Sequence, residues 1–339
     1  MKKLVKNKKL FIGCSFILLL LLFSFVYSLF LHNIISQPPD AIYGEDHRLV
    51  DVPPYPPSKE HPLGVDRYGE DILWKVIDGA KYTIMVAFIV SVIRITISLF
   101  GSILFVMFLH RLTFIIESFI RAFRFIPGVI LAYIFFMTIK SDTGISNLTL
   151  ITQQVLVLGF IGGIPLTGYL ATELRGFLKN DFIKCSQSLG ATKSWLIRKH
   201  IMNYLRPRLL ILFAQQVVQS LLILVHLGVF QMIIGKVKTL KFMNGISSAD
   251  SVTLSLSNEW SGLIGLSYRE LMLNQWIVVG PSVAFVLTIY SFRLIEKGLK
   301  ETLEGPEQNH ILIEKETLTA EDSGSPFTLV TKKSSHLHT

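Results

Sequence analysis

Long stretches of apolar residues alternate with polar, often basic, stretches along this chain of 339 residues. An apolar stretch of about 20 residues, folded as a helix, crosses the roughly 30 Å hydrocarbon core of a bilayer. A soluble domain would instead spread its apolar residues over one face of each element. The pattern predicts six membrane-spanning helices, at residues 10–31, 83–109, 119–139, 155–174, 209–234 and 276–294. We therefore expect an all-α polytopic membrane protein.

The spans divide the chain into an N-terminus with the first helix (1–31), an extracytoplasmic segment (32–81), a transmembrane core (82–298) with a long loop at 175–208, and a tail (299–339). The first helix is expected to be retained rather than cleaved as a signal peptide. Its apolar stretch is longer than that of a signal peptide, and no small-residue cleavage site follows it. The polar tail is expected to be disordered.

The positions of the prolines predict further local structure. Proline pairs in the segment 32–81 favour extended chain, and the end of that segment, 68–81, is predicted to form a short amphipathic helix. Pro127 is expected to kink the third span without ending it.

The distribution of basic residues predicts the orientation in the membrane. The loop 175–208 is rich in Lys and Arg, and the stretch 110–124 is also basic, which is typical of cytoplasmic loops. Six spans then place both termini in the cytoplasm. The more acidic segment 32–81 falls on the outer side, as the same rule favours.

Composition agrees with a membrane protein and excludes several other classes. Half of the residues are hydrophobic, and 17% are charged, below the roughly 25% of soluble proteins. Membrane-surface lysines and arginines explain the net charge of +9 better than nucleic-acid binding does. Cys14 and Cys185 have neither a disulfide nor a metal-ligand arrangement. No nucleotide-binding loop, HExxH or GxSxG motif occurs, so we expect no enzyme, no cofactor and no metal.

The basic loop is predicted to contain two helices around a glycine turn. Apolar positions recur in residues 181–189 and again in 194–205, and Gly190 lies between them, where glycine commonly ends a helix. Such a pair could present one face to a cytoplasmic partner. Its periodicity fits equally an amphipathic helix lying at the lipid headgroups.

Residues 181–192, DFIKCSQSLGAT, resemble the coupling loop of ATP-binding-cassette (ABC) importer permeases, whose pattern is approximately EYVEAARALGAS. Residues 61–71, HPLGVDRYGED, resemble the signature HPLGTDxxGRD of the permeases that import oligopeptides, dipeptides or nickel. Residues 260–262 and 281–299 resemble the last outer loop and final helix of the same subfamily. The resemblance covers roughly residues 60–304.

This resemblance implies the fold of a type I ABC importer permease and a set of partners. Two permeases would pair around a central path, ABC ATPases would dock on the coupling loops, and an extracytoplasmic solute-binding protein would deliver the solute. The chain itself would contact membrane lipid and no nucleic acid. The coupling residues implied are Asp181, Phe182, Ile183, Lys184, Cys185, Ser186, Leu189, Gly190 and Ala191. Among them Phe182, Ile183 and Leu189 are expected to form the apolar contact with the ATPase.

Several positions depart from the family pattern. Its Glu-Ala-Ala falls on Lys184, Cys185 and Ser186, and the arginine of its outer signature falls on Glu70. Loss of the small Ala-Ala pair alters the expected docking surface, and the charge reversal at Lys184 calls for a matching ATPase.

Two polar residues within the spans are candidates for the translocation path. Arg94 could line a cavity that attracts a peptide carboxylate, or could be a structural arginine paired with a buried acceptor. His226 could face the path, although a packed histidine is the more common arrangement.

The function predicted is therefore that of a permease subunit in an importer of oligopeptides or dipeptides across the cytoplasmic membrane. The alternatives are import of nickel or another small solute, and a permease-derived interaction protein that does not transport.

Overall fold

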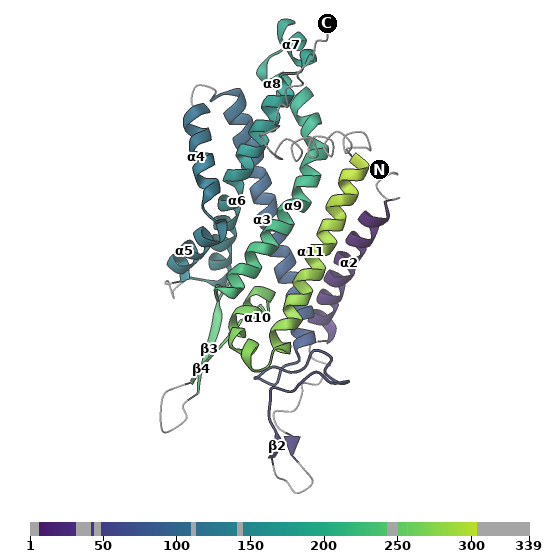
Figure 1. The fold of residues 1–339 in the computed structure, drawn as a ribbon, viewed down its shortest axis with the longest axis vertical. Coiled ribbons are helices and arrows are strands. Elements are labelled where there is room, and N and C mark those ends of the chain that lie inside the picture. The colour runs from purple at the N-terminus through teal and green to yellow at the C-terminus, as the bar shows by residue number, and fades with distance from the viewer. Residues whose placement is uncertain are drawn as a thin grey trace, which may run out of the picture.

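The computed structural model describes residues 7–31, 42–43, 49–109, 113–140, 145–242, 250–255 and 257–303. The tail that was expected to be disordered lies outside the described residues from position 304 onward. Most of the segment 32–48 lies outside them too. The helices form one elongated bundle (Figure 1). They are α2 (Lys8–Val26) with a π-helical turn (Tyr27–Leu31), α3 (Ile72–Met107), α4 (Thr113–Phe125), α5 (Gly128–Lys140), α6 (Asn147–Leu178), α7 (Asp181–Ser188), α8 (Lys193–Leu196) with a π-helical turn (Ile197–Ile201), α9 (Met202–Val229), α10 (Trp260–Leu266), a 3-10 helix (Tyr268–Met272) and α11 (Trp276–Leu303).

Two antiparallel hairpins, which the sequence pattern did not predict, lie at one end of the bundle (Figure 1). The first pairs β1 (Ile42–Tyr43) with β2 (Leu49–Asp51). The second pairs β3 (Val237–Phe242) with β4 (Asp250–Ser255), and Val237 lies opposite Ser255. Helices α7 and α8 project from the opposite end, where the N-terminus of α2 also lies.

The prediction of an all-α polytopic membrane protein is confirmed. In the part of the chain that the structure describes, five helices are long and apolar enough to cross a membrane: Lys8–Leu31, Ile72–Met107, Asn147–Leu178, Lys193–Val229 and Trp276–Leu303. Large apolar side chains cover their outer faces, such as Phe100 at 70% exposure and Val286 at 64%. Such a continuous apolar surface fits contact with lipid or with another membrane protein.

The third predicted span is the exception. Helices α4 and α5 take its place, and their stretches Glu117–Phe123 and Gly128–Ile139 meet at 82°. The expected kink is thus a break. Pro127 has no N–H to donate, and its ring disfavours helical geometry at the preceding residue. The count of six spans holds only if α4 and α5 together form one.

Helix α3 begins earlier than predicted and absorbs the short amphipathic helix expected at 68–81. It runs for 36 residues from Ile72. The Asp71 carboxylate caps its N-terminus by accepting a hydrogen bond from the Leu73 N–H at 2.8 Å. At 1.5 Å per residue the helix is about 54 Å long, so it extends beyond the hydrocarbon core at its ends.

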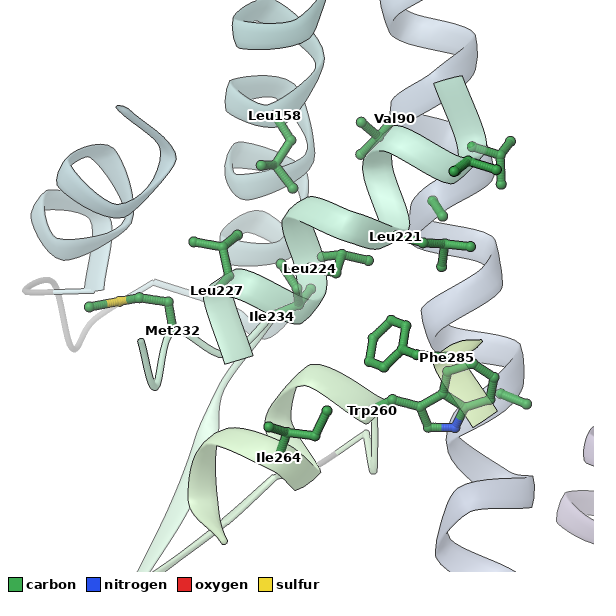
Figure 2. Packing of buried hydrophobic residues seen from close by; sticks show 14 of the residues in the cluster. Val90, Leu158, Leu221, Leu224, Leu227, Met232, Ile234, Trp260, Ile264 and Phe285 are labelled. Carbon is green, nitrogen blue, oxygen red and sulfur yellow. The ribbon is translucent and has the colours of Figure 1, made fainter. Parts of the chain in front are cut away.

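The main apolar core lies where α3, α6, α9, α10 and α11 meet, and Figure 2 shows part of it. Trp260, at the start of α10, is fully buried in it. Its ring packs edge-on against Phe285 of α11, with ring centroids 5.2 Å apart. Its indole Nε1–H donates to the Val76 carbonyl of α3 at 2.7 Å. One side chain therefore joins three helices, and its polar atom is satisfied as burial requires.

Glu259 anchors the start of the short helix α10. Its carboxylate accepts hydrogen bonds from the Ser261 N–H at 3.0 Å and from the Ile234 N–H at 3.3 Å. Burial raises the pKa of this carboxyl, and the hydrogen bonds from Ser261, Ile234 and Gly262 lower it in part. The residue thus joins the chain after α9 to α10.

Close helix approach depends on positions without a side chain. A Cβ on Gly79 of α3 would lie 1.9 Å from the Asn258 carbonyl oxygen, just before α10. A Cβ on Gly162 of α6 would lie 2.1 Å from Nε of Arg94. Neither group can yield easily, since the first is backbone and the second is a buried side chain.

Replacing Gly79 by alanine should therefore destabilise the protein by about 1–3 kcal/mol, the usual size of an overpacking effect. Gly176→Ala is the matched control, because a Cβ there meets nothing within 4 Å. Alanine should be neutral or slightly stabilising at that helical position. Thermal unfolding of both variants in detergent tests this, and equal melting temperatures would contradict the close contact.

Candidate functional site: the coupling segment

The residues 181–201, here named the coupling segment, form a compact helix–turn–helix at one end of the bundle (Figure 1). Helix α7 ends in a Schellman motif: the Ala191 N–H donates to the Ser186 carbonyl at 3.1 Å, and the Gly190 N–H to the Gln187 carbonyl at 2.9 Å. Gly190 has a φ of +86°, which glycine adopts without strain. The expected helix–glycine–helix is therefore present.

The second helix of the segment is not a separate element as predicted. Thr192 caps α8 by accepting a hydrogen bond from the Trp195 N–H at 3.3 Å. The chain then passes through the π-helical turn Ile197–Ile201 directly into α9. The second part of the coupling segment, from Lys193, is thus continuous with the membrane-spanning helix that ends at Val229.

One face of the segment is buried. Ile183 and Ile201 are fully buried and Leu196 is 2% exposed, in a cluster with Leu170 and Leu174 of α6. The expectation that Ile183 contacts an ATPase is therefore wrong, because none of this side chain is exposed. Its side chain fixes α7 to the bundle, because α7 lies with that face toward α6.

The opposite face carries the exposed apolar side chains. Leu189 is 88% exposed, Phe182 51% and Trp195 46%. A shallow hollow in this face is lined by Ser186, Leu189, Gly190, Ala191, Thr192 and Trp195. Lys184 and Cys185 are exposed beside it, and Lys184 forms a 2.9 Å ion pair with Asp181. Exposed ion pairs of this kind contribute little to stability, so these charges are available to a partner.

Aromatic rings support the exposed face from beneath. His200 lies between Phe182 and Trp195, with ring centroids 5.7 and 5.1 Å away. Phe177 of α6 stacks on Tyr204 of α9 at 4.1 Å. The two half-exposed rings of the face are thus fixed in position. Sequence periodicity could not have revealed the part played by His200 and Tyr204, because it does not specify ring contacts between elements.

Arg94 is buried between α3, α6 and α9, with 1% exposure. Its Nε–H donates to the Leu158 carbonyl at 3.1 Å, and Nη1 to Oε1 of Gln216 at 3.5 Å. Nη2 has no hydrogen-bond partner in the described part of the chain. This arrangement favours the structural arginine with a buried acceptor over the cavity lining.

His226 is exposed, so the packed arrangement considered for it is wrong. Its ring Nδ1 lies 2.5 Å from the Leu222 carbonyl, one turn earlier in α9. Gln216, which contacts Arg94, is ten residues away on the same helix, or about 15 Å along its axis. The structure does not bring the two path candidates together.

At the other end of the bundle, the signature in residues 61–71 forms a polar network. Nδ1 of His61 lies 2.8 Å from the Asp71 carboxylate that caps α3. Lys75 forms ion pairs with Asp66 and with Glu70. Glu70 stands where the family pattern has arginine, and here its carboxylate pairs with Lys75 in the first turn of α3.

Gly64 and Arg67 of the same segment contact residues at and just before the start of α11. A Cβ on Gly64, which has a φ of +78°, would lie 2.7 Å from the Trp276 ring, and Arg67 forms an ion pair with Glu270. The residues of the signature thus pack between the N-terminal end of α3 and the start of α11. Among the described residues, no group of His, Cys, Asp or Glu side chains is arranged to hold a metal ion.

A polytopic helical bundle with an exposed helix–glycine–helix at one end is the arrangement that the resemblance to membrane permeases predicts. Comparison with curated proteins supports this class. The glutathione transport system permease protein GsiD of Escherichia coli O1:K1 is 24% identical over 253 residues, which is 73% of each chain. The same protein of Escherichia coli O157:H7 matches equally, and that of Shigella flexneri serotype 5b is 23% identical over 252 residues. No family model matches the chain.

The chain is therefore similar to these transport permeases over most of its length, and the resemblance to importer permeases seen in its motifs is confirmed.

The two faces of α7 should respond differently to truncation. Ile183→Ala removes a fully buried side chain and should cost about 2–5 kcal/mol of stability. Leu189→Ala shortens a side chain that is 88% exposed and should change stability by less than about 0.5 kcal/mol. Thermal unfolding in the same detergent checks both variants, and an equally large loss in Leu189→Ala would contradict the assigned faces.

Proposed function

We propose that this chain is one permease subunit of an ABC importer that moves peptides across the cytoplasmic membrane, with ATP hydrolysed by a separate chain. The observation that carries the proposal is the coupling segment. It combines a rigidly supported inner face with an exposed apolar outer face centred on Leu189. A fixed apolar surface that ends in a membrane-spanning helix is what a cytoplasmic motor requires to move that helix.

The remaining partners follow from the same proposal. A second permease subunit completes the path, ABC ATPases dock on the coupling segments, and an extracytoplasmic solute-binding protein delivers the solute at the end that carries the 61–71 network. Both termini are cytoplasmic, on the side of the basic loop 175–208. The sequence motifs and the glutathione permeases among the relatives favour a peptide solute, since glutathione is itself a small peptide.

ATP binding would close the ATPases and displace the coupling segments as rigid bodies. Since α8 runs into α9 through Ile197–Ile201, that displacement reaches the membrane without passing through a flexible loop. The ATPase contact is assigned to the exposed side chains of Phe182, Leu189 and Trp195. The buried side chain of Ile183 holds α7 against the bundle.

The first test is purification of the tagged chain from its native membrane in mild detergent. We expect a second polytopic permease and a chain with a nucleotide-binding loop to co-purify, and cells to take up labelled short peptides in a manner that depends on the ATPase. Purification of the chain alone, or uptake that survives loss of the ATPase, would contradict the proposal.

Leu189→Asp should reduce the recovered ATPase at least about tenfold, because a carboxylate would be buried in an apolar contact. Met272→Asp is the matched control, since Met272 is as exposed, at 90% against 88%, but belongs to the 3-10 helix near α10. Quantifying the ATPase bound per permease tests the difference. Equal losses in both variants would assign the effect to folding rather than to docking.

Arg94→Met separates the two interpretations of Arg94. Methionine fills similar space but gives the Leu158 carbonyl and Gln216 no hydrogen bond, so a purely structural role predicts a loss of about 1–3 kcal/mol of stability and normal uptake by the protein that folds. A role in the path predicts a stable protein whose uptake of peptides is lost. Uptake measured at matched protein levels, beside a melting curve, distinguishes the two outcomes.

A further inference from the structure

Lys193 connects the coupling segment to a helix that is not its neighbour in sequence. Its ammonium group donates a hydrogen bond to the Met107 carbonyl at 2.8 Å. It also lies 5.2 Å from the centroid of the Phe108 ring. Met107 is the last residue of α3, and Phe108 caps that helix.

The chemistry of a helix end suits this contact. The last four carbonyls of a helix lack partners within it, and they carry the negative end of the helix dipole. A lysine ammonium satisfies one such carbonyl and is attracted by the dipole as well. The Phe108 ring adds a cation–π contact on a second side.

The contact completes the attachment of the coupling segment to the bundle. The chain itself joins the segment to α6, through residues 179–180, and to α9, through Ile197–Ile201. Apolar packing fixes Ile183 and Leu196 in the cluster that also contains Met107. Apolar packing is non-directional, whereas the lysine–carbonyl hydrogen bond joins a defined point of the segment to a defined point on α3.

Helix α3 reaches from this point to the opposite end of the bundle (Figure 1). There its Val76 carbonyl accepts the indole hydrogen bond of Trp260, and Asp71 caps it. A displacement of Lys193 along the axis of α3 therefore acts on the residues near α10 and on the 61–71 network.

We propose that Lys193 is a positioning residue for transport: it ties the coupling segment to the end of α3, so that movement driven by the ATPase displaces α3 together with α9. The inference rests on the proposed function. Lys193 itself needs no contact with the ATPase or the solute.

The test uses the whole transporter, reconstituted in lipid nanodiscs and proteoliposomes with its second permease and ATPase. Lys193→Met retains the length of the side chain and removes the ammonium group. Lys193 is an exposed residue, so its hydrogen bond to the Met107 carbonyl is partly screened by solvent. We expect ATPase binding and basal hydrolysis to be unchanged and the peptide taken up per ATP hydrolysed to fall about two- to fivefold. Lys193→Arg should restore most of the ratio. Lys199→Met removes a second lysine of the same segment that is exposed as Lys193 is, but away from the Met107 carbonyl, and should leave the ratio unchanged.

A second measurement reports on the contact without transport. In the isolated permease, Lys193→Met should speed amide hydrogen exchange at Phe108 and Leu109, whose N–H groups both bond to the Leu104 carbonyl. Lys199→Met should not.

An uptake-per-ATP ratio equal to that of the wild type in Lys193→Met would overturn the inference, whatever the exchange rates. Loss of ATPase binding in that variant would overturn it as well, because Lys193 would then be a docking residue. If the wild-type complex forms no contact with an ATPase or takes up no peptide, the proposed function fails first. The exchange experiment would then still show whether the Lys193–Met107 contact exists.

Discussion

Helix α3 lies closest to its neighbours at positions where a glycine provides room, and the arrangement of the bundle depends on these approaches. Gly162 of α6 makes room for the Arg94 side chain, whose Nε–H reaches the Leu158 carbonyl one turn away. Gly79 makes the corresponding room for the backbone at Asn258. Inside a bilayer no water is present to satisfy a buried polar group, so these short distances let the protein supply the partners itself.

The two ends of the bundle are held by different forces. At the hairpin end, ion pairs and hydrogen bonds such as His61–Asp71 and Trp260–Val76 fix the residues in direction as well as in distance. At the coupling end, apolar packing around Ile183 and Leu196 supplies most of the burial. Directional contacts such as the Lys193–Met107 and Tyr204–Glu173 hydrogen bonds supplement that packing at the coupling end.

The sequence predicted the class of fold, five of the spans and the turn at Gly190, because each depends on a local pattern of hydrophobicity or backbone conformation. It failed where long-range contacts decide. Ile183 was assigned to the exposed face, since a helix of two turns does not reveal which side the core occupies. Helix α10 was missed because Trp260 and Glu259 are fixed by partners on α3 and in the chain after α9. The acceptors of Arg94 and Lys193 include backbone carbonyls, which no side-chain pattern records.

The break at Pro127 has a consequence for the biogenesis of the protein. Helices α4 and α5 have 13 residues each, so each is only about 20 Å long, shorter than the hydrocarbon core. Neither can enter the lipid as a free-standing span with its backbone ends satisfied. Both pack against α6, which follows them in the chain. We therefore expect the α4–α5 pair to be stable in the bilayer only together with α6, so that these three helices enter the membrane as one folding unit.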